Sequence, residues 1–381
     1  IFYLKLLQKY WIYLAFVLFF GTLTCLGNKV DPNTSKPLGL NIKASYNLGF
    51  MLAHRTKMQH IPKQLVQGFE MSIERQSNNE KDWGKIYNNP KVGISFLATG
   101  TGNYDIMGTG FGLNCYLLFP LVNTEKFKLK TSWGWGLGWI TKKFEPQNNY
   151  ENNTIGSHIN LFAAIKLMGE YYFSPKLAMT FGVSFHHWSN SAFKYPNLGL
   201  NLPSANLGFI YKFRDEIPFN KLSKVDKKKL KPREKGELTL ISNLGFKAYS
   251  VDDNSTYSAY SLELNYARLW SSKWKLSGGV DLIYNTAYAR EIEISVDPSK
   301  RNNSAFQSGL NLTYHQTIGS ISILLGMGAY VIDNTLQNEV FYHKFGSRFL
   351  IKDRIIISTV LFTHWARADH MRWGIGYKFK K

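Results

Sequence analysis

The sequence predicts an all-β protein, an antiparallel β-barrel of the outer membrane, on three observations. Beyond about Asn41 the chain consists of long runs of alternating character, separated by clusters of Gly, Asn, Asp, Ser and Lys. The runs are about 10 to 14 residues long, which exceeds the usual globular strand and suits tilted strands that cross a bilayer. Trp, Tyr and Phe are spread along the whole chain, as the aromatic girdles of such a barrel require.

Composition narrows the class of protein further. The chain has 381 residues, of which 44% are hydrophobic and 19% charged, so bulk disorder is excluded. Its two cysteines, Cys25 and Cys115, are too few for a disulfide framework or a multi-cysteine zinc site. We therefore expect neither a metal ion nor a cofactor.

The first residues have the layout of an export signal. Lys5 and Lys9 precede an apolar run from Trp11 to Phe20, and small or weakly polar residues follow up to Cys25. We predict a signal peptide over residues 1–25, with an uncleaved anchor or a lipidated Cys25 as the alternatives. No later stretch has the length and uniform apolarity of a transmembrane helix, so strands must cross the membrane.

The alternating runs predict sixteen strands in two sets. In the first half they span residues 48–55, 67–75, 91–98, 105–118, 127–140, 158–172, 177–189 and 201–213. In the second half they span residues 237–250, 257–270, 274–285, 305–317, 320–331, 341–351, 355–365 and 371–380. We predict two eight-stranded units in tandem, residues 41–214 and 237–381. One larger barrel of about sixteen strands is the alternative, because turn spacing does not distinguish one closure from two.

An internal repeat favours two units. The sequence Asn-Leu-Gly-Phe occurs at Asn47–Phe50 and again at Asn243–Phe246. Near the end of the two sets, Phe185–Asn190 corresponds to Phe362–Arg367. The second unit therefore looks like a degenerate copy of the first.

Residues 215–236, between the two units, are predicted to be a basic linker. They are rich in Lys and poor in apolar residues, and they contribute to the net charge of +20 of the whole chain. An exported chain with this pattern fits solvation or attraction to an anionic membrane surface better than nucleic-acid binding. We expect no nucleic-acid partner.

The alternation of residues along the seventh run predicts the face of the strand on which its polar residues lie. Leu177, Phe181 and Phe185 share one face, which we expect to contact lipid. His187 and Ser189 continue that face, whereas His186 falls on the interior face. An imidazole and a hydroxyl two residues apart on one strand face can act as base and nucleophile, although the spacing by itself is common.

The residues here also resemble a known family. His187-Trp188-Ser189-Asn190, followed by Pro196-Asn197-Leu198-Gly199, resembles the signature of the PagL-type lipid A 3-O-deacylases, also called acyloxyacyl hydrolases. In that family a His-x-Ser-Asn element precedes a Pro-Asn-x-Gly element. The resemblance covers roughly residues 41–214. It implies an eight-stranded outer-membrane barrel that removes an ester-linked acyl chain from lipid A at a site on the outside of the barrel.

The resemblance also implies roles for single residues. Ser189 is expected to be the nucleophile and His187 the general base, with Asn190 close to the oxyanion. Lys194 is placed by topology and not by the resemblance: with both termini of an even-stranded unit on the periplasmic side, the seventh strand ends outside, and this residue of the following loop is expected to meet the phosphates of lipid A.

Two departures from the family pattern affect these expectations. Asn201 occupies the position of the family's Glu; its carbonyl can accept the imidazole N–H of the base but brings no charge, so another carboxylate such as Glu170 is the alternative. In the second unit Ala366 occupies the nucleophile position beside His364, and we expect that unit to be non-catalytic. His54, next to the first turn, is expected to be an interfacial or capping residue.

These observations predict an outer-membrane esterase that removes an acyl chain from lipid A of lipopolysaccharide. Its partners would be lipopolysaccharide and the other lipids of that membrane. The alternative is a non-enzymatic barrel, structural or lipopolysaccharide-binding. The presence of both His187 and Ser189 favours the enzyme, whereas Asn201 and the extra unit favour the alternative.

Overall fold

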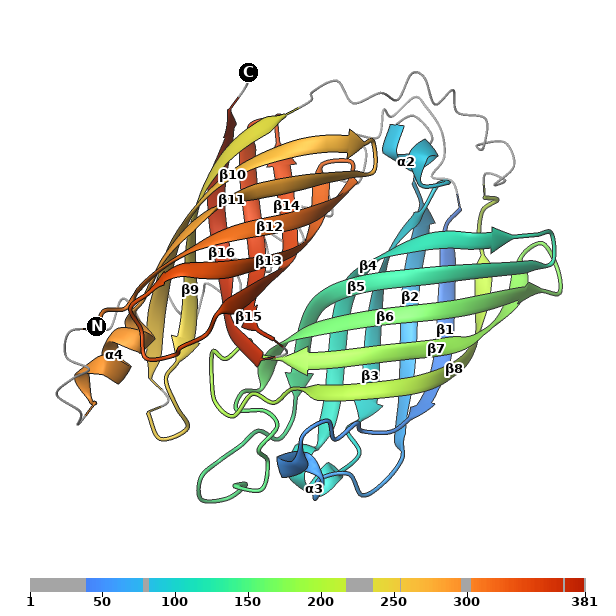
Figure 1. Cartoon of the computed structure of the whole chain (residues 1–381). Coiled ribbons are helices and arrows are strands. Elements are labelled where there is room, and N and C mark those ends of the chain that lie inside the picture. Colours follow the sequence, from blue (N-terminus) through green and yellow to red (C-terminus); the bar gives the residue numbers. More distant parts are fainter. Residues whose placement is uncertain are drawn as a thin grey trace. The chain divides into compact units, whose positions relative to one another are not determined.

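The protein consists of two closed β-barrels in tandem. The computed structural model describes residues 39–77, 82–216, 236–253, 255–295, 303–365 and 367–379. These form two compact units, each built on one antiparallel barrel of eight strands (Figure 1). The prediction of two eight-stranded units is thereby confirmed against the single barrel of sixteen. The predicted signal peptide, residues 217–235 of the predicted linker, and Ala366 lie outside the described residues.

The first barrel is an uninterrupted meander in which each strand pairs with the next and β8 pairs with β1. Its strands are β1 (Asn41–Gly49), β2 (Val66–Gln76), β3 (Lys91–Gly100), β4 (Thr109–Asn123), β5 (Phe127–Ile140), β6 (Ile159–Tyr172), β7 (Leu177–Ser189) and β8 (Leu200–Lys212). Three short helical segments join strands: η1 (Thr56–Met58), α2 (Asp82–Ile86) and α3 (Tyr104–Met107).

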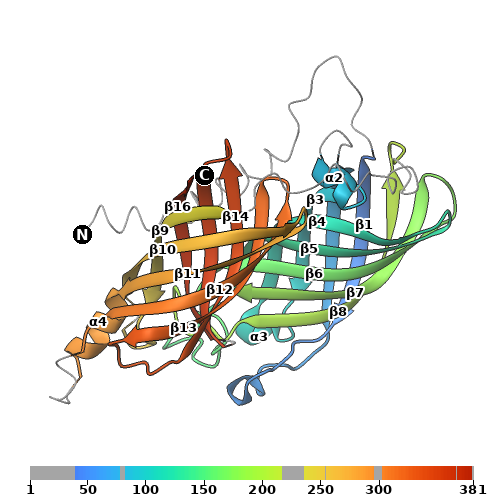
Figure 2. The same cartoon turned by 45° about the horizontal axis from the view of Figure 1, so that its top comes forward.

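The two ends of this barrel differ in their connections. One end carries two tight turns, residues 124–126 and 173–176, together with the segment that contains α2. The other end carries the longer loops and α3, at residues 50–65, 101–108, 141–158 and 190–199 (Figures 1 and 2). Bacterial barrels have short periplasmic turns and longer extracellular loops. By this rule we expect the end at which β7 finishes, hereafter the extracellular end, to face outward from the cell.

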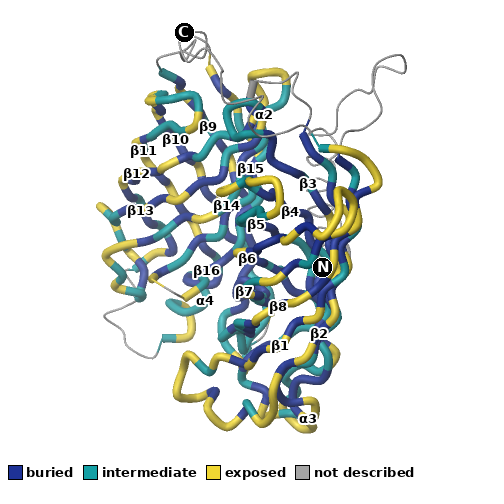
Figure 3. The backbone as a smooth tube through the Cα atoms, turned by 90° about the vertical axis from the view of Figure 1, so that its right-hand side faces the viewer, coloured by how far each residue is buried: buried dark blue, intermediate teal, exposed yellow. Residues whose placement is uncertain are grey.

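Buried and exposed residues alternate along the strands, as Figure 3 shows, and the buried ones are mainly polar while the exposed ones are mainly apolar. On β2, Phe69 and Ile73 are 51% and 56% exposed, while Glu70 and Glu74 point inward and are buried. Inside, the Lys91 Nζ atom lies 2.9 Å from Glu74 Oε1. An exterior of this kind is stable only against lipid, because a large exposed apolar surface is unfavourable in water.

The interior becomes apolar near the extracellular end. There a cluster of buried side chains fills the barrel: Met51, Met58, Ile61, Val66, Leu97, Ile106, Met107, Ile140, Ile155, Phe162, Ala164, Trp188, Leu200 and Leu202. This plug gives the strand ends and the loops above them a packed support. It also excludes the barrel interior as a route to the end of β7.

The second barrel repeats the meander. Its strands are β9 (Glu237–Ala248), β10 (Thr256–Ser271), β11 (Trp274–Asn285), β12 (Phe306–Ile318), β13 (Ile321–Asp333), β14 (Phe341–Ile351), β15 (Ile355–His364) and β16 (Arg367–Phe379), and β16 closes on β9. Helix α4 (Thr286–Glu293) joins β11 to β12. Its interior holds buried ion pairs, such as Lys344 Nζ to Asp281 Oδ2 at 3.0 Å. None of the described helices is long and apolar enough to cross a membrane.

Two predicted strands begin at the wrong residue. The run predicted at 48–55 is wrong, because the strand is β1 and the chain leaves the regular sheet after Gly49. Apolar residues such as Met51 made 48–53 look strand-like, but Met51 packs in the interior plug. The run predicted from Asp105 begins with a turn of helix, which the Asn103 side chain caps by accepting the N–H groups of Asp105 and Ile106.

Candidate functional site

At the end of β7, successive side chains point alternately into the barrel and toward its outer face. Trp188 is completely buried; its Nε1 donates to the carbonyl of Phe111 at 2.9 Å, and its ring packs on Phe162. Because successive side chains alternate, an inward Trp188 turns His187 and Ser189 outward. The predicted parity is confirmed, since His186 is buried in the interior while His187 and Ser189 are half-buried on the outer face.

His187 and Asn201 face each other across the β7–β8 pair. They are directly opposite in the register, and side chains at such positions meet on one face of a sheet. The Nδ1 atom of His187 lies 2.6 Å from Oδ1 of Asn201. With the imidazole proton on Nδ1, this contact leaves the Nε2 lone pair of His187 available to accept another proton.

Ser189 and Asn190 share a partner that sequence reasoning did not assign. Ser189 Oγ donates to Oδ1 of Asn197 at 3.1 Å, and the backbone N–H of Asn190 donates to the same oxygen at 2.9 Å. The Asn190 side chain points elsewhere, because its Nδ2 donates to Ser157 Oγ at 2.9 Å. Asn197 belongs to the Pro-Asn-x-Gly element, so the motif was a usable signal for it.

At Gly199 the backbone of the β7–β8 loop passes close to the imidazole ring of His187. Its φ of +83° lies in the left-handed region that side chains rarely adopt. A Cβ atom at this position would lie 2.8 Å from Cε1 of His187. The glycine of the motif therefore allows the backbone to pass directly beside the His187 ring.

His54 contacts the site from the opposite side of Asn201. The segment after β1 continues along β8, since Leu52 N–H donates to the carbonyl of Asn201 at 2.9 Å. Two residues further, Nδ1 of His54 lies 3.0 Å from Nδ2 of Asn201. The expectation of a merely interfacial or capping residue did not anticipate this contact.

Other predicted residues lie elsewhere. Glu170 is buried inside the first barrel, where it accepts from Lys130 Nζ at 2.6 Å and from Tyr172 Oη at 2.6 Å. It faces Thr180, near the start of β7, so the suggestion that it replaces the family's Glu is wrong. Lys194 is half-buried in the loop between β7 and β8.

The second barrel does not reproduce the site. His364 is buried on the interior face of β15, and its Nε2 lies 2.9 Å from Tyr330 Oη. His187 lies on the outer face of its barrel, so the predicted equivalence of the two histidines is wrong. One position of slip in the repeat moves a side chain to the other face of the sheet.

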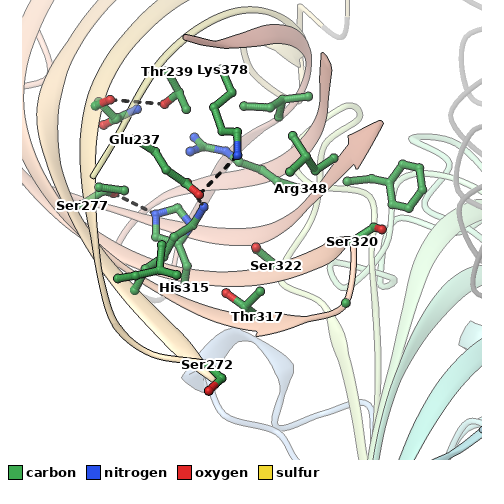
Figure 4. A pocket seen from close by; sticks show the side chains of 18 of the residues that line it. Glu237, Thr239, Ser272, Ser277, His315, Thr317, Ser320, Ser322, Arg348 and Lys378 are labelled. Atoms are coloured by element: carbon green, nitrogen blue, oxygen red, sulfur yellow. Dashed lines mark hydrogen bonds and ion pairs between the residues drawn. The ribbon is translucent and has the colours of Figure 1, made fainter. Parts of the chain in front are cut away.

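The second barrel does contain a serine next to a histidine. Ser277 Oγ lies 2.8 Å from His315 Nε2, at a cavity of about 110 Å³ inside the barrel (Figure 4). Both residues are only 2% exposed, and among the described residues His315 Nδ1 has no hydrogen-bond partner. Glu237 and Arg348 also line this cavity. A pair enclosed in a polar interior cannot reach a lipid, and nothing there orients the imidazole.

No group of three or more potential metal-binding His, Cys, Asp or Glu side chains occurs among the described residues. At the end of β7, Ser189 offers a hydroxyl and His187 an imidazole held at Nδ1. The amides of Asn197 and Asn201 contact these two residues. Such a set can perform acyl transfer from an ester through general-base and hydrogen-bond catalysis.

The fold and the position of this site define an outer-membrane β-barrel protein whose polar site lies on the outside of the barrel, at the end that carries the longer loops. Residues 67–209 match the family model described as lipid A 3-O-deacylase (PagL). Residues 236–381 match the model described as acyloxyacyl hydrolase, C-terminal domain. Together these matches cover more than half of the chain, which belongs to the lipid A 3-O-deacylase (acyloxyacyl hydrolase) family. It is accordingly an ester hydrolase, of a family that acts on lipid A in the outer membrane.

Several solved structures are similar to about half of this chain. Neisserial surface protein A has 10% sequence identity and a TM-score of 0.32, over 47% of this chain and 100% of that one. The outer membrane enzyme PagL has 14% identity and a TM-score of 0.31, over 46% of this chain and 99% of that one. Ail of Yersinia pestis has 13% identity and a TM-score of 0.27, over 47% and 100%. No curated protein matches the chain in sequence.

Proposed function

We propose that the first barrel removes an ester-linked acyl chain from lipid A, with Ser189 as the nucleophile, His187 as the general base and Asn201 as the residue that orients His187. The observation that carries this proposal is the 2.6 Å contact between His187 Nδ1 and Asn201 Oδ1 on the outer face of the barrel. It supports the tautomer in which Nε2 can take a proton, two residues from a hydroxyl on the same strand face.

The reaction proceeds in two halves. Ser189 Oγ gives its proton to His187 Nε2 and attacks the ester carbonyl carbon, forming a tetrahedral oxyanion. The oxyanion collapses, the bond to the sugar oxygen breaks, and the leaving hydroxyl takes the proton from His187. Water then hydrolyses the acyl-enzyme by the reverse sequence of proton transfers, which releases a fatty acid and restores Ser189.

The Nδ2 group of Asn197 is the hydrogen-bond donor that we assign to the developing oxyanion, whereas the Asn190 backbone N–H is already donated to Asn197 Oδ1. Asn197 Oδ1 contacts both Ser189 Oγ and the Asn190 N–H, so this amide already lies beside the attacking atom. Removing one such hydrogen-bond donor typically costs about 10²–10³ in turnover. Asn190 was expected close to the oxyanion; its side chain is not assigned as a donor, because its Nδ2 donates to Ser157 Oγ.

The surroundings of the site suit one acyl chain and one charged head group. On the neighbouring strands Ala163 lies opposite His187, and Pro203 lies opposite Phe185, so the outer surface beside the site is apolar. Lys194 follows in the loop that joins β7 to β8 and is our candidate for contact with a phosphate of lipid A.

Mass spectrometry of lipid A tests the proposal. Cells that express the protein should contain lipid A lacking one acyl chain, and Ser189→Ala should abolish this change because only binding and oxyanion contacts remain. Ser277→Ala, which alters the enclosed Ser–His pair of the second barrel, is the matched control and should retain activity. Undiminished deacylation by Ser189→Ala would contradict the assignment of the nucleophile. Unmodified lipid A in all strains would favour a barrel that only binds lipopolysaccharide.

A further inference from the structure

Asn201 lies between two imidazole rings. Its Oδ1 contacts Nδ1 of His187 at 2.6 Å, and its Nδ2 contacts Nδ1 of His54 at 3.0 Å. The three residues come from adjacent parts of the barrel wall: β7, β8 and the segment that continues β1 along β8.

An amide poses a problem that a carboxylate does not. A carboxylate presents only oxygen atoms to the imidazole, so it accepts the Nδ1 proton in either orientation. A rotated Asn201 amide would present Nδ2 to His187, which then must accept at Nδ1 and carry its proton on Nε2. In that tautomer His187 has no lone pair for the hydroxyl of Ser189. The side chain therefore needs a second partner to select its orientation.

His54 can make that selection when neutral. An Nδ1 lone pair accepts from Nδ2 of Asn201, which leaves Oδ1 toward His187. The same Nδ1 lies 3.4 Å from the carbonyl of Leu52, a longer contact, and that carbonyl already accepts the His54 N–H at 3.0 Å. The shorter contact is the one to Asn201.

The segment that carries His54 is fixed on the barrel. Met58 and Ile61 are completely buried in the apolar plug. The carbonyl of Ile61 accepts from the Asn103 side chain at 2.8 Å, and Leu52 is bonded to the backbone of Asn201. His54 is thus attached between two anchored points, and the exposed position of its ring does not leave the backbone loose.

We propose that His54 is a positioning residue that fixes the orientation of the Asn201 amide and, through it, the tautomer of His187 that can act as a base. This inference rests on the proposed function and adds a positioning residue to the same site. It explains how a chain with Asn in place of the family's carboxylate can hold the imidazole in its active form.

A double-mutant cycle tests the coupling between residues 54 and 201. In the full-length chain, His54→Ala should lower kcat for lipid A deacylation by about fivefold, with KM little changed, because one orienting hydrogen bond is lost. In an Asn201→Glu background the same substitution should change kcat less than about twofold, because a carboxylate has no wrong orientation. Equal losses in both backgrounds, no loss in either, or an effect confined to KM would overturn the inference.

His60→Ala is the matched control. His60 lies on the same segment and is exposed, and its Nε2 lies 2.9 Å from the carbonyl oxygen of Glu151 in the loop between β5 and β6. It should retain the kcat of the unmodified protein. If His60→Ala lowers kcat as much as His54→Ala, a general disturbance of the segment explains the loss and the inference fails.

The tautomer can also be measured without turnover. In detergent micelles, the ¹⁵N chemical shifts of His187, assigned by their loss in His187→Gln, should show a proton on Nδ1 in the unmodified protein. In His54→Ala a substantial fraction should carry it on Nε2 instead. An unchanged tautomer in His54→Ala would overturn the inference. This result does not depend on Ser189 being the nucleophile, so failure of the proposed function is distinguished by Ser189→Ala alone.

Discussion

Asn201 Oδ1 accepts from His187 Nδ1 at 2.6 Å because the two residues are directly opposite each other on β8 and β7. Both lie on the outer face of the barrel, whereas the residues next to them, Trp188 and Leu200, are completely buried. The contact is neutral, so it can orient the imidazole but cannot stabilise an imidazolium by charge.

We predict opposite effects for two substitutions of Asn201. Asn201→Ala should lower turnover roughly tenfold to a thousandfold, since His187 loses its orienting partner, while Asn201→Glu should retain or raise turnover by adding charge opposite the developing imidazolium. Deacylation rates of purified, heat-modifiable barrels provide the measurement. A fully active Asn201→Ala in an assembled barrel would mean that the third catalytic member lies elsewhere.

A methyl group at Gly199 should displace the base. Gly199→Ala meets strain at φ +83° and a contact 2.8 Å from His187 Cε1, so we expect kcat to fall at least about tenfold. Gly100→Ala is the control, because a Cβ there finds no atom closer than 3.7 Å. Comparable rates for the two variants would show that the close passage of Gly199 past His187 is unimportant for catalysis.

Acid should remove one contribution to stability at the periplasmic end of the first barrel. Burial by itself would raise the pKa of Glu216, but the ammonium groups of Lys91, Lys130, Lys128 and Lys212 hold that pKa well below its ordinary value of 4.5. A depressed pKa stabilises the folded state above pH 4.5, and this stabilisation disappears as the pH falls toward the folded-state value.

The measurement is denaturant unfolding of Glu216→Gln in micelles. At pH 7 the variant should be less stable by roughly 3 kcal/mol, because buried lysines lose a partner. The difference from the unmodified protein should shrink as the pH is lowered through the range below 4.5. A difference that is independent of pH would contradict the electrostatic origin.

Loop lengths predict the orientation in the membrane. Tyr150, 68% exposed in the loop between β5 and β6, lies at the same end as Ser189, and Glu125 lies in the tight turn at the other end. On intact cells a membrane-impermeant maleimide should label Tyr150→Cys and not Glu125→Cys. The native Cys115 is buried and should not react. Labelling of Glu125→Cys alone would reverse the orientation and place the site in the inner leaflet.

The sequence by itself determined the fold class, most strand positions and the outward face of Ser189 and His187. The physical reason is that a strand has a period of two, and lipid demands apolar side chains at every second position. Prediction from the sequence was least reliable where this rule fails. In the plug, Met51 points into an apolar interior. In the second repeat, His364 lies on the interior face, whereas His187 lies on the outer face of the first barrel.

Only the tertiary structure decided which contacts complete the site. The family motif already pointed to Asn201 and offered a signal for Asn197, but His54 had none. The contacts of all three residues at the end of β7 depend on the pairing of distant segments and on a loop that folds back. The closure of two barrels in place of one was likewise decided by β8 pairing with β1 and β16 with β9. Local alternation fixes the face on which a residue lies, whereas register between strands fixes its neighbours, and chemistry depends on the neighbours.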